Sequence, residues 1–188
     1  MPLGDKRQAI LDAALDLFAE RGFHGTAVPL VADRAGVGAG TVYRYFDSKE
    51  ALVNELFQFW KQLLGRALLE DFPLNKGTRA QFHEIWKRLF EFAALHPKAV
   101  AFLELHHHRD YLDARSRAVE SALLTPLKAF VLDAQKQKTL RPTTPEVLMA
   151  MVYGTFTALL RASAEKHITL SQALLDEAEN ALWDAVRR

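Results

Sequence analysis

The stretch that decides the fold runs from Val28 to Lys49 and reads VPLVADRAGVGAGTVYRYFDSK. Its first part, residues 28–35, predicts a short helix with Leu30 among the residues turned inward. Gly36 follows where that helix has to stop and the chain needs a positive φ, which glycine adopts without steric cost. A second short helix is expected over residues 41–46. A helix, a short turn containing glycine and a second helix are typical of a helix-turn-helix, whose second helix enters a DNA major groove.

An ordinary corner between two packed helices is the alternative, but its second helix would carry mainly apolar residues. Here the outward positions hold hydroxyl, phenol and guanidinium groups, which contact phosphates and base edges in protein–DNA complexes. The run RGFHGTAVPLVADRAGVGAGTVYRYFDSKEALV, residues 21–53, resembles the tetracycline-repressor-like (TetR) transcriptional regulators. The resemblance covers about the first quarter of the chain at the level of motifs, and the remainder agrees in length and helical layout.

The resemblance implies DNA contacts at Thr26, Ala39, Gly40, Thr41, Tyr43, Arg44, Tyr45 and Lys49. Two of these, Thr26 and Lys49, match positions that touch backbone phosphate, and Thr26 is also expected to cap the helix that follows it. Ala39 and Gly40 lack reach, so they offer a methyl contact or a close backbone approach to the groove. Arg44 is the best candidate for reading a guanine edge, because its guanidinium can form two parallel hydrogen bonds.

Composition sets the outer bounds. The chain has 188 residues, 49% apolar and 25% charged, as in an ordinary soluble globular protein. It lacks an apolar run of the roughly 18 residues that span a bilayer and a signal-peptide pattern, so we expect a cytoplasmic protein without a membrane partner. Cysteine is absent, which excludes thiolate chemistry. Residues 1–50 contain six basic and seven acidic side chains, so DNA affinity must come from the placement of a few groups.

Hydrophobic periodicity predicts an all-α protein of about nine helices, without a strand pattern. The expected helices cover about 5–21, 28–35, 41–46, 49–68, 79–95, 97–105, 112–138, 146–165 and 170–186. We expect a three-helix DNA-binding head with the helix-turn-helix over residues 1–48. A larger helical domain for ligand binding and dimerisation is expected over residues 49–188.

The triplet His106-His107-His108 is the most conspicuous polar cluster. Three consecutive residues on a helix point about 100° apart, so they cannot converge on one ion, although Glu104 shares a face with His107 or His108. A helical metal sensor is therefore an alternative, while our main expectation is a protein without a metal or cofactor. No serine of the sequence lies in a nucleophile-elbow motif, and the sequence contains no glycine-rich phosphate-binding loop. We therefore do not expect an enzyme.

The aromatic residues of the middle and late helices form either a core or the lining of a ligand cavity. The resemblance favours the cavity, because members of that family bind small molecules there. The residues assigned to this effector site are Phe82, His83, Trp86, Phe90, Phe102, His106, Tyr111, Leu127, Phe130, Tyr153 and Phe156. Because most of them are apolar, we expect a mostly apolar effector.

The last two predicted helices carry apolar residues over wide arcs, more than one packed face requires. The resemblance implies a homodimer interface built from these two helices of each subunit. Its expected residues are Leu148, Val152, Phe156, Leu159, Leu174, Leu175, Ala178 and Leu182. We therefore expect a repressor that binds a palindromic operator as a homodimer and is released by a small effector. A DNA-binding dimer without an effector is the second alternative.

Overall fold

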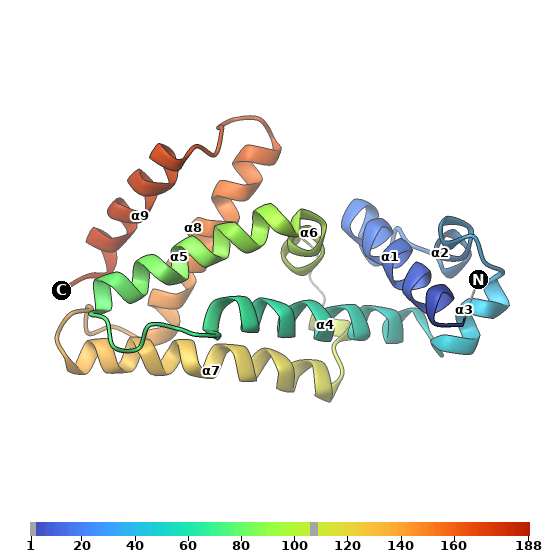
Figure 1. Ribbon diagram of the computed structural model, residues 1–188, viewed down its shortest axis with the longest axis horizontal. Helices are drawn as coiled ribbons and strands as arrows, with labels where there is room; N and C mark the ends of the chain where they lie inside the picture. The colour runs from blue at the N-terminus through green and yellow to red at the C-terminus, as the bar shows by residue number, and fades with distance from the viewer. Residues whose placement is uncertain (1–2, 106–108) are drawn as a thin grey trace. The chain divides into compact units, whose positions relative to one another are not determined.

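The computed structural model describes residues 3–105 and 109–188, which form nine α-helices and one short 3-10 helix (Figure 1). The elements are α1 (Leu3–Arg21), α2 (Val28–Ala35), α3 (Ala39–Tyr45), α4 (Lys49–Leu69), α5 (Thr78–Leu95), α6 (Pro97–Leu105), η1 (Arg109–Tyr111), α7 (Ala114–Lys136), α8 (Pro145–Ala164) and α9 (Gln172–Val186). The predicted all-α fold and its helix order are confirmed.

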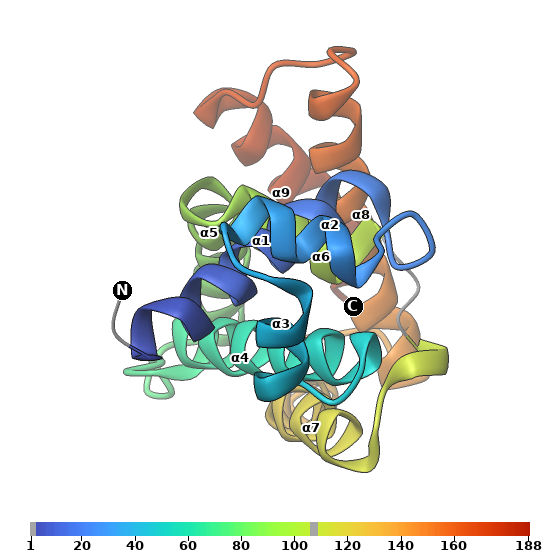
Figure 2. The same ribbon diagram turned by 90° about the vertical axis from the view of Figure 1, so that its right-hand side faces the viewer.

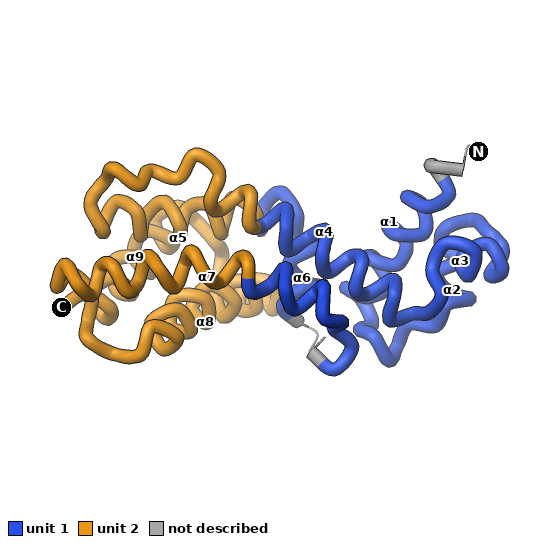
Figure 3. Tube along the Cα trace, turned by 90° about the horizontal axis from the view of Figure 1, so that it is seen from below, with its two compact units in different colours: residues 1–64, 93–121 blue, residues 65–92, 122–188 orange. Residues whose placement is uncertain are grey.

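The chain divides into two compact units, coloured separately in Figure 3. Unit 1 comprises residues 1–64 and 93–121, and unit 2 comprises residues 65–92 and 122–188. Both α4 and α7 contribute residues to each unit. The expected boundary between residues 48 and 49 separates a DNA-binding part from a part for ligand binding and dimerisation, and this division of functions stays a prediction. The packing of the chain follows the two units.

The core of unit 1 forms around α1. Ile10, Ala14 and Phe18 are spaced four residues apart, so they lie on one side of the helix, and all three are fully buried. The Phe18 ring lies 6.1 Å from the ring of Phe102 on α6 and 6.3 Å from that of Phe23. α1 ends before Gly22, which has a φ of +68°. The head is thus closed by apolar contacts between α1, its following loop and α6.

The helix-turn-helix forms where the sequence predicts it, and Figure 2 shows α2 leading into α3. Gly36 follows α2 with φ +66° and ψ +35°, and its N–H donates to the carbonyl oxygens of Ala32 and Asp33. This left-handed cap stops α2 and turns the chain, as expected of glycine at this position. Val42 of α3 is buried in the same core as α2, which fixes the second helix against the first.

Two local predictions in this motif are wrong. Leu30 is 38% exposed, because α2 buries Val28, Val31 and Ala32 instead, a set spaced three and four residues apart. Thr26 does not cap α2, since the N-cap residue is Ala27 and no side chain accepts a hydrogen bond there. The apolar side of α2 is therefore rotated relative to the predicted one.

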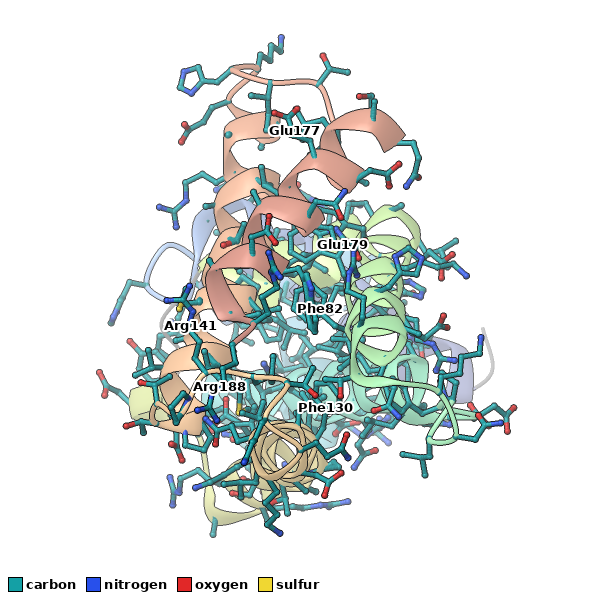
Figure 4. The ribbon with its side chains drawn as sticks, turned by 90° about the vertical axis from the view of Figure 1, so that its left-hand side faces the viewer. Phe82, Phe130, Arg141, Glu177, Glu179 and Arg188 are labelled. Carbon is teal, nitrogen blue, oxygen red and sulfur yellow. The ribbon has the colours of Figure 1, made fainter. Side chains whose placement is uncertain are left out.

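Unit 2 is held by aromatic contacts between α5 and the two last helices. The Trp86 indole N–H donates to the carbonyl oxygen of Leu175 at 3.2 Å, and the Phe90 ring lies 5.0 Å from that of Phe156. Phe82 lies among the side chains enclosed by the helices of this unit, as does Phe130 (Figure 4). These contacts make α5 the element on which α8 and α9 pack.

The end of the chain is tied into unit 2 by main-chain hydrogen bonds. Arg141 N–H donates to the carbonyl oxygen of Val186 at 3.0 Å, and Arg188 N–H donates to that of Thr139 at 2.9 Å. Figure 4 labels Arg141 and Arg188 on the two segments that these bonds join. α9 is thereby fixed at its carboxyl end to the connection between α7 and α8.

α8 is unusual in the described part of the chain, because it is the one helix there that is long and apolar enough to cross a membrane by length and composition. Within this 20-residue helix, an 18-residue stretch has a mean hydropathy of 1.4, and only 11% of that stretch is buried inside the chain. Val147 is 48% exposed and Met151 is 36% exposed. A largely apolar helix is thus left uncovered by its own chain.

Candidate nucleic-acid interface

α3 presents one polar and one apolar side. Val42 and Phe46, four residues apart, are buried, whereas Tyr43 is 53% exposed and Arg44 is exposed beside it. Among the predicted DNA contacts on this helix, Ala39 and Gly40 are also exposed, and Thr41 and Tyr45 are half-buried. Ala39, Gly40, Tyr43 and Arg44 therefore face solvent, where a duplex could reach them, whereas the Tyr45 ring packs against the core.

Thr26 lies inside the head. Its side chain is buried, and its hydroxyl lies 2.8 Å from the carbonyl oxygen of Gly22 and 3.1 Å from that of Leu17. The prediction that Thr26 contacts a phosphate is not tested by this structure, in which the hydroxyl binds these two main-chain oxygens and the residue is buried. Its role is to close the loop after α1.

Lys49 also holds the loop after α1. Its ammonium group donates to the carbonyl oxygens of Phe23 at 2.8 Å and Thr26 at 3.0 Å, and it lies 3.9 Å from the centre of the Phe23 ring. Two of its three N–H groups are thus used within unit 1. A phosphate contact through the third stays a prediction.

The arginines of the head differ in their partners. Arg7 pairs with Glu55, and Arg34 pairs with Glu20 on α1 at 3.4 Å. Within the part of the chain that the structure describes, the Arg44 guanidinium has neither an ion pair nor a hydrogen bond. Its charge is therefore available to an external partner, and the nearly balanced charge of the head makes this availability important.

The predicted effector residues separate between the units. In unit 2, Phe82, Trp86, Phe90 and Phe156 are buried, and Leu127, Phe130 and Tyr153 are half-buried. His83 is half-exposed, and its Nδ1 lies 2.8 Å from a carboxylate oxygen of Glu179, which Figure 4 labels on α9. Arg79 pairs with the same buried carboxylate. His106 lies outside the described residues.

Two of the residues assigned to the effector site lie in unit 1, and their assignment stays a prediction. Phe102 has no exposed surface, and its ring packs on that of Phe18. Tyr111 stacks on Phe23 with ring centroids 3.8 Å apart, and its hydroxyl lies 2.5 Å from Nε2 of His24. Sequence reasoning missed these partners, because nothing in the local pattern links residues 87 positions apart.

The metal-sensor alternative rests on residues that lie outside the described chain, His106-His107-His108. Glu104, its expected helper, has a carboxylate oxygen 3.8 Å from the Lys61 ammonium, and burial raises the pKa of Glu104 while Lys61 opposes that rise. Over residues 3–105 and 109–188, no group of three or more histidine and acidic side chains is arranged to hold a metal ion.

An open hollow of about 650 Å³ lies at the start of α5. Gly77, Thr78, Arg79, Ala80 and His83 line it. Of the predicted effector residues that the structure describes, His83 alone takes part in it, so the aromatic set and this hollow are different places.

The predicted dimer residues fall into two groups. Leu148, Phe156 and Leu182 are buried within a single chain, and the prediction that they meet a partner stays a prediction. The remaining residues are half-buried: Val152, Leu159, Leu174, Leu175 and Ala178. Exposed apolar surface on α8 instead follows another side of the helix, defined here as the α8 outer face: Val147, Met151, Gly154 and Ala158.

Comparison with known proteins agrees with this geometry. The model of the tetracyclin repressor-like C-terminal domain matches residues 50–188, and the model of bacterial regulatory proteins of the tetR family matches residues 10–56. RutR, an HTH-type transcriptional regulator of Escherichia coli (strain K12), is 31% identical over 156 residues, which are 79% of this chain and 71% of that protein. YhgD, an HTH-type transcriptional regulator of Bacillus subtilis (strain 168), is 25% identical over 89% of each chain.

A solved structure shows the same fold along the whole chain. A TetR-family transcription regulator from Shewanella sp. PV-4 superposes with a TM-score of 0.82 at 26% identity, over 97% of this chain and 98% of that one. The helix-turn-helix and the helical layout define an all-α DNA-binding regulator. The chain belongs to the TetR family of transcriptional regulators. The matched relatives are regulators rather than enzymes.

Proposed function

We propose that the protein is a homodimeric repressor that reads a palindromic operator through α3 and is released by a small effector. The observation that carries the proposal is the exposed side of α3, where Tyr43 and Arg44 face solvent over a buried Val42. A rigid helix with exposed hydrogen-bonding groups is what readout of a major groove requires.

The proposed contacts differ in what they read. Arg44 donates two hydrogen bonds to a guanine edge, and this contact supplies discrimination of roughly 1–3 kcal/mol. Ala39 and Gly40 let the backbone approach the bases, while Thr41 and the two tyrosines reach phosphates or base edges. Lys49 adds a phosphate contact through its remaining N–H group. These roles rest on exposure and donor chemistry, together with membership of the family.

Dimerisation is proposed through the α8 outer face. Val147, Met151, Gly154 and Ala158 lie three or four residues apart, so they form one stripe on the helix. The small Gly154 and Ala158 allow another helix to approach closely. A second copy would cover this apolar stripe and place two α3 helices for two half-sites of an operator. A cytoplasmic, soluble dimer accounts for the exposed α8 without a membrane.

The effector is proposed to bind in unit 2 next to the half-buried side chains of Leu127, Phe130 and Tyr153, and to be mostly apolar. It favours a form of the dimer that binds the operator less tightly, and it shifts the equilibrium only by its difference in affinity for the two forms. The close packing of Phe90 on Phe156 favours a second candidate, a DNA-binding dimer that responds to no small effector. A thermal-shift screen with apolar carboxylates, phenols and sterols would separate the two candidates.

The experiment that tests DNA reading compares wild type with Arg44→Ala. Fluorescence anisotropy would measure binding to a fragment selected by the protein from genomic DNA and to a scrambled version, over a series of salt concentrations. We expect Arg44→Ala to lose about 5- to 100-fold in preference for the selected fragment. Arg66→Ala is the matched control, because Arg66 is an exposed arginine outside the head. Equal preference in wild type and Arg44→Ala would remove Arg44 from base reading.

A further inference from the structure

The short segment that leads from η1 into α7 contacts the head at the loop before the helix-turn-helix. Tyr111 stacks on Phe23 with ring centroids 3.8 Å apart and an angle of 20° between the rings. Its hydroxyl lies 2.5 Å from Nε2 of His24. Phe23 and His24 belong to the loop that joins α1 to α2. Tyr111 thus contacts the loop that directly precedes the helix-turn-helix.

The same loop is held from a second side by α4. The Lys49 ammonium binds the carbonyl oxygens of Phe23 and Thr26 and lies 3.9 Å from the centre of the Phe23 ring. Thr26 is followed directly by Ala27, the N-cap residue of α2. The position of the loop therefore sets the position and orientation of α2. The turn at Gly36 connects α2 to α3, so the orientation of α3 depends on that of α2.

The backbone of residues 111–113 is bound to α4 through Asn54. The amide nitrogen of Asn54 donates to the carbonyl oxygen of Tyr111 at 2.7 Å, and the amide oxygen accepts from Asp113 N–H at 2.8 Å. That oxygen also accepts from the Ser116 hydroxyl at 2.7 Å, which in turn accepts from the Gln58 side chain at 3.0 Å. Asn54 and Ser116 are buried.

A buried polar network with its donors and acceptors satisfied permits one geometry and penalises displacement of any member. The start of α7 is fixed by the same network, since Ser116 N–H donates to the Asp113 carboxylate at 2.7 Å and holds the pKa of Asp113 below its ordinary value. Tyr111 is therefore placed by α4 and α7 and is not an incidental surface contact.

We propose that Tyr111 is a positioning residue that couples residues 111–116, at the start of α7, to the DNA-binding head. Its ring and hydroxyl hold the Phe23–His24 loop, and the loop holds α2 and α3 in the orientation that binds DNA. The proposal rests on the proposed function in DNA binding. Because coupling between two sites is reciprocal, DNA bound at α3 must also stabilise the segment around Tyr111.

Hydrogen–deuterium exchange of the full chain tests this reciprocity without knowledge of the effector. The protein is compared with and without a saturating DNA fragment that it selects from genomic DNA. In wild type we expect slower amide exchange on DNA binding in two places, residues 28–45 and residues 111–117. In Tyr111→Ala, at DNA saturation, we expect the first effect to remain and the second to disappear.

Affinity measurements separate positioning from general damage. We expect Tyr111→Ala to weaken DNA binding about three- to tenfold, because it removes both the ring stack and the hydroxyl contact. Tyr111→Phe keeps the stack and should recover most of the affinity. His24→Ala removes the contact between Nε2 and the Tyr111 hydroxyl from the side of an exposed residue. The double variant with Tyr111→Phe should therefore lose no more DNA affinity than either single variant. Phe59→Ala, at an exposed aromatic residue of α4, is the control.

Three results would overturn the proposal. Wild-type protein that binds DNA without slower exchange over residues 111–117 would show that the segment is not coupled to the head. Tyr111→Ala with wild-type DNA affinity and wild-type exchange would remove Tyr111 from the coupling. If Tyr111→Ala does not fold, a double variant of Tyr111→Phe and His24→Ala whose loss of DNA affinity equals the sum of the two single losses would do so. Wild-type protein that prefers no DNA fragment would refute the proposed function itself, and the coupling with it.

Discussion

The head and the α8–α9 hairpin solve the burial of apolar residues in different ways. In the head, the apolar residues of α1 are covered by neighbouring elements of unit 1, and Ile10 and Phe18 are fully buried. In the hairpin, α8 is apolar around most of its circumference, and Val147 and Met151 remain exposed. One region completes its core within the chain, while the other leaves apolar surface that its own chain does not cover.

Polar contacts show the same contrast. The hairpin is fixed to α5 by a buried carboxylate, Glu179, which pairs with Arg79 and His83. The loop of the head is fixed by the Thr26 hydroxyl and the Lys49 ammonium on main-chain oxygens. The hairpin therefore adds a buried charge network to its aromatic contacts with α5, whereas main-chain oxygens bind the two polar groups that fix the loop of the head. Four substitutions test this difference, from the largest expected effect on stability to the smallest.

Phe18→Ala should have the largest effect. Removing a fully buried ring from a core that is already closed leaves a cavity, and we expect a loss of about 3–5 kcal/mol in the free energy of unfolding. Urea unfolding followed by circular dichroism measures it. Phe59→Ala, at a 51% exposed ring, should change the same quantity by about 0.5 kcal/mol or less. A small loss for Phe18→Ala would show that the head core is not closed.

Arg79→Ala should weaken the hairpin by about 2 kcal/mol, because it leaves the buried Glu179 carboxylate with one partner fewer. The measurement is again the free energy of unfolding in urea. Lys87→Ala is the matched control, since the Lys87–Glu91 pair is exposed and contributes little. Equal effects of the two changes would mean that the charge network does not anchor α9.

Thr26→Val should cost about 1 kcal/mol, because valine has nearly the same shape but leaves the carbonyl oxygens of Gly22 and Leu17 without the hydroxyl. Thr26→Ser keeps the hydroxyl and serves as the control for the methyl group. If Thr26→Val instead left stability unchanged and reduced DNA affinity, Thr26 would have the phosphate contact that its burial argues against.

Met151→Glu should change the stability of the subunit least, by about 0.5 kcal/mol or less, because Met151 lies on the α8 outer face. Its effect should appear in association, since a buried charge at an apolar interface prevents docking. Sedimentation velocity should show monomers. Leu74→Glu, at an 81% exposed loop residue, is the control and should leave the dimer intact. Dimers of Met151→Glu would place the interface elsewhere.

Several features of the protein follow from its sequence alone. Hydrophobic periodicity gave the helices and their order, and glycine at residue 36 fixed the turn of the helix-turn-helix, because both effects act over a few neighbouring residues. The polar outer side of α3 was also predictable, since polar residues surround the apolar Val42 within two helical turns. The same local motif carries the resemblance to the TetR family, and the family model of the DNA-binding part matches residues 10–56.

Other features were decided only by tertiary structure. Leu30 turned outward and Thr26 inward, because contacts with α1 and its following loop selected the buried side of α2. Leu148 and Leu182 are apolar residues predicted at an interface, and contacts within the chain already bury both. Tyr111 meets Phe23 through a fold that joins distant segments. A sequence pattern marks which residues avoid water, but the partner that covers each of them depends on contacts between residues far apart in the chain.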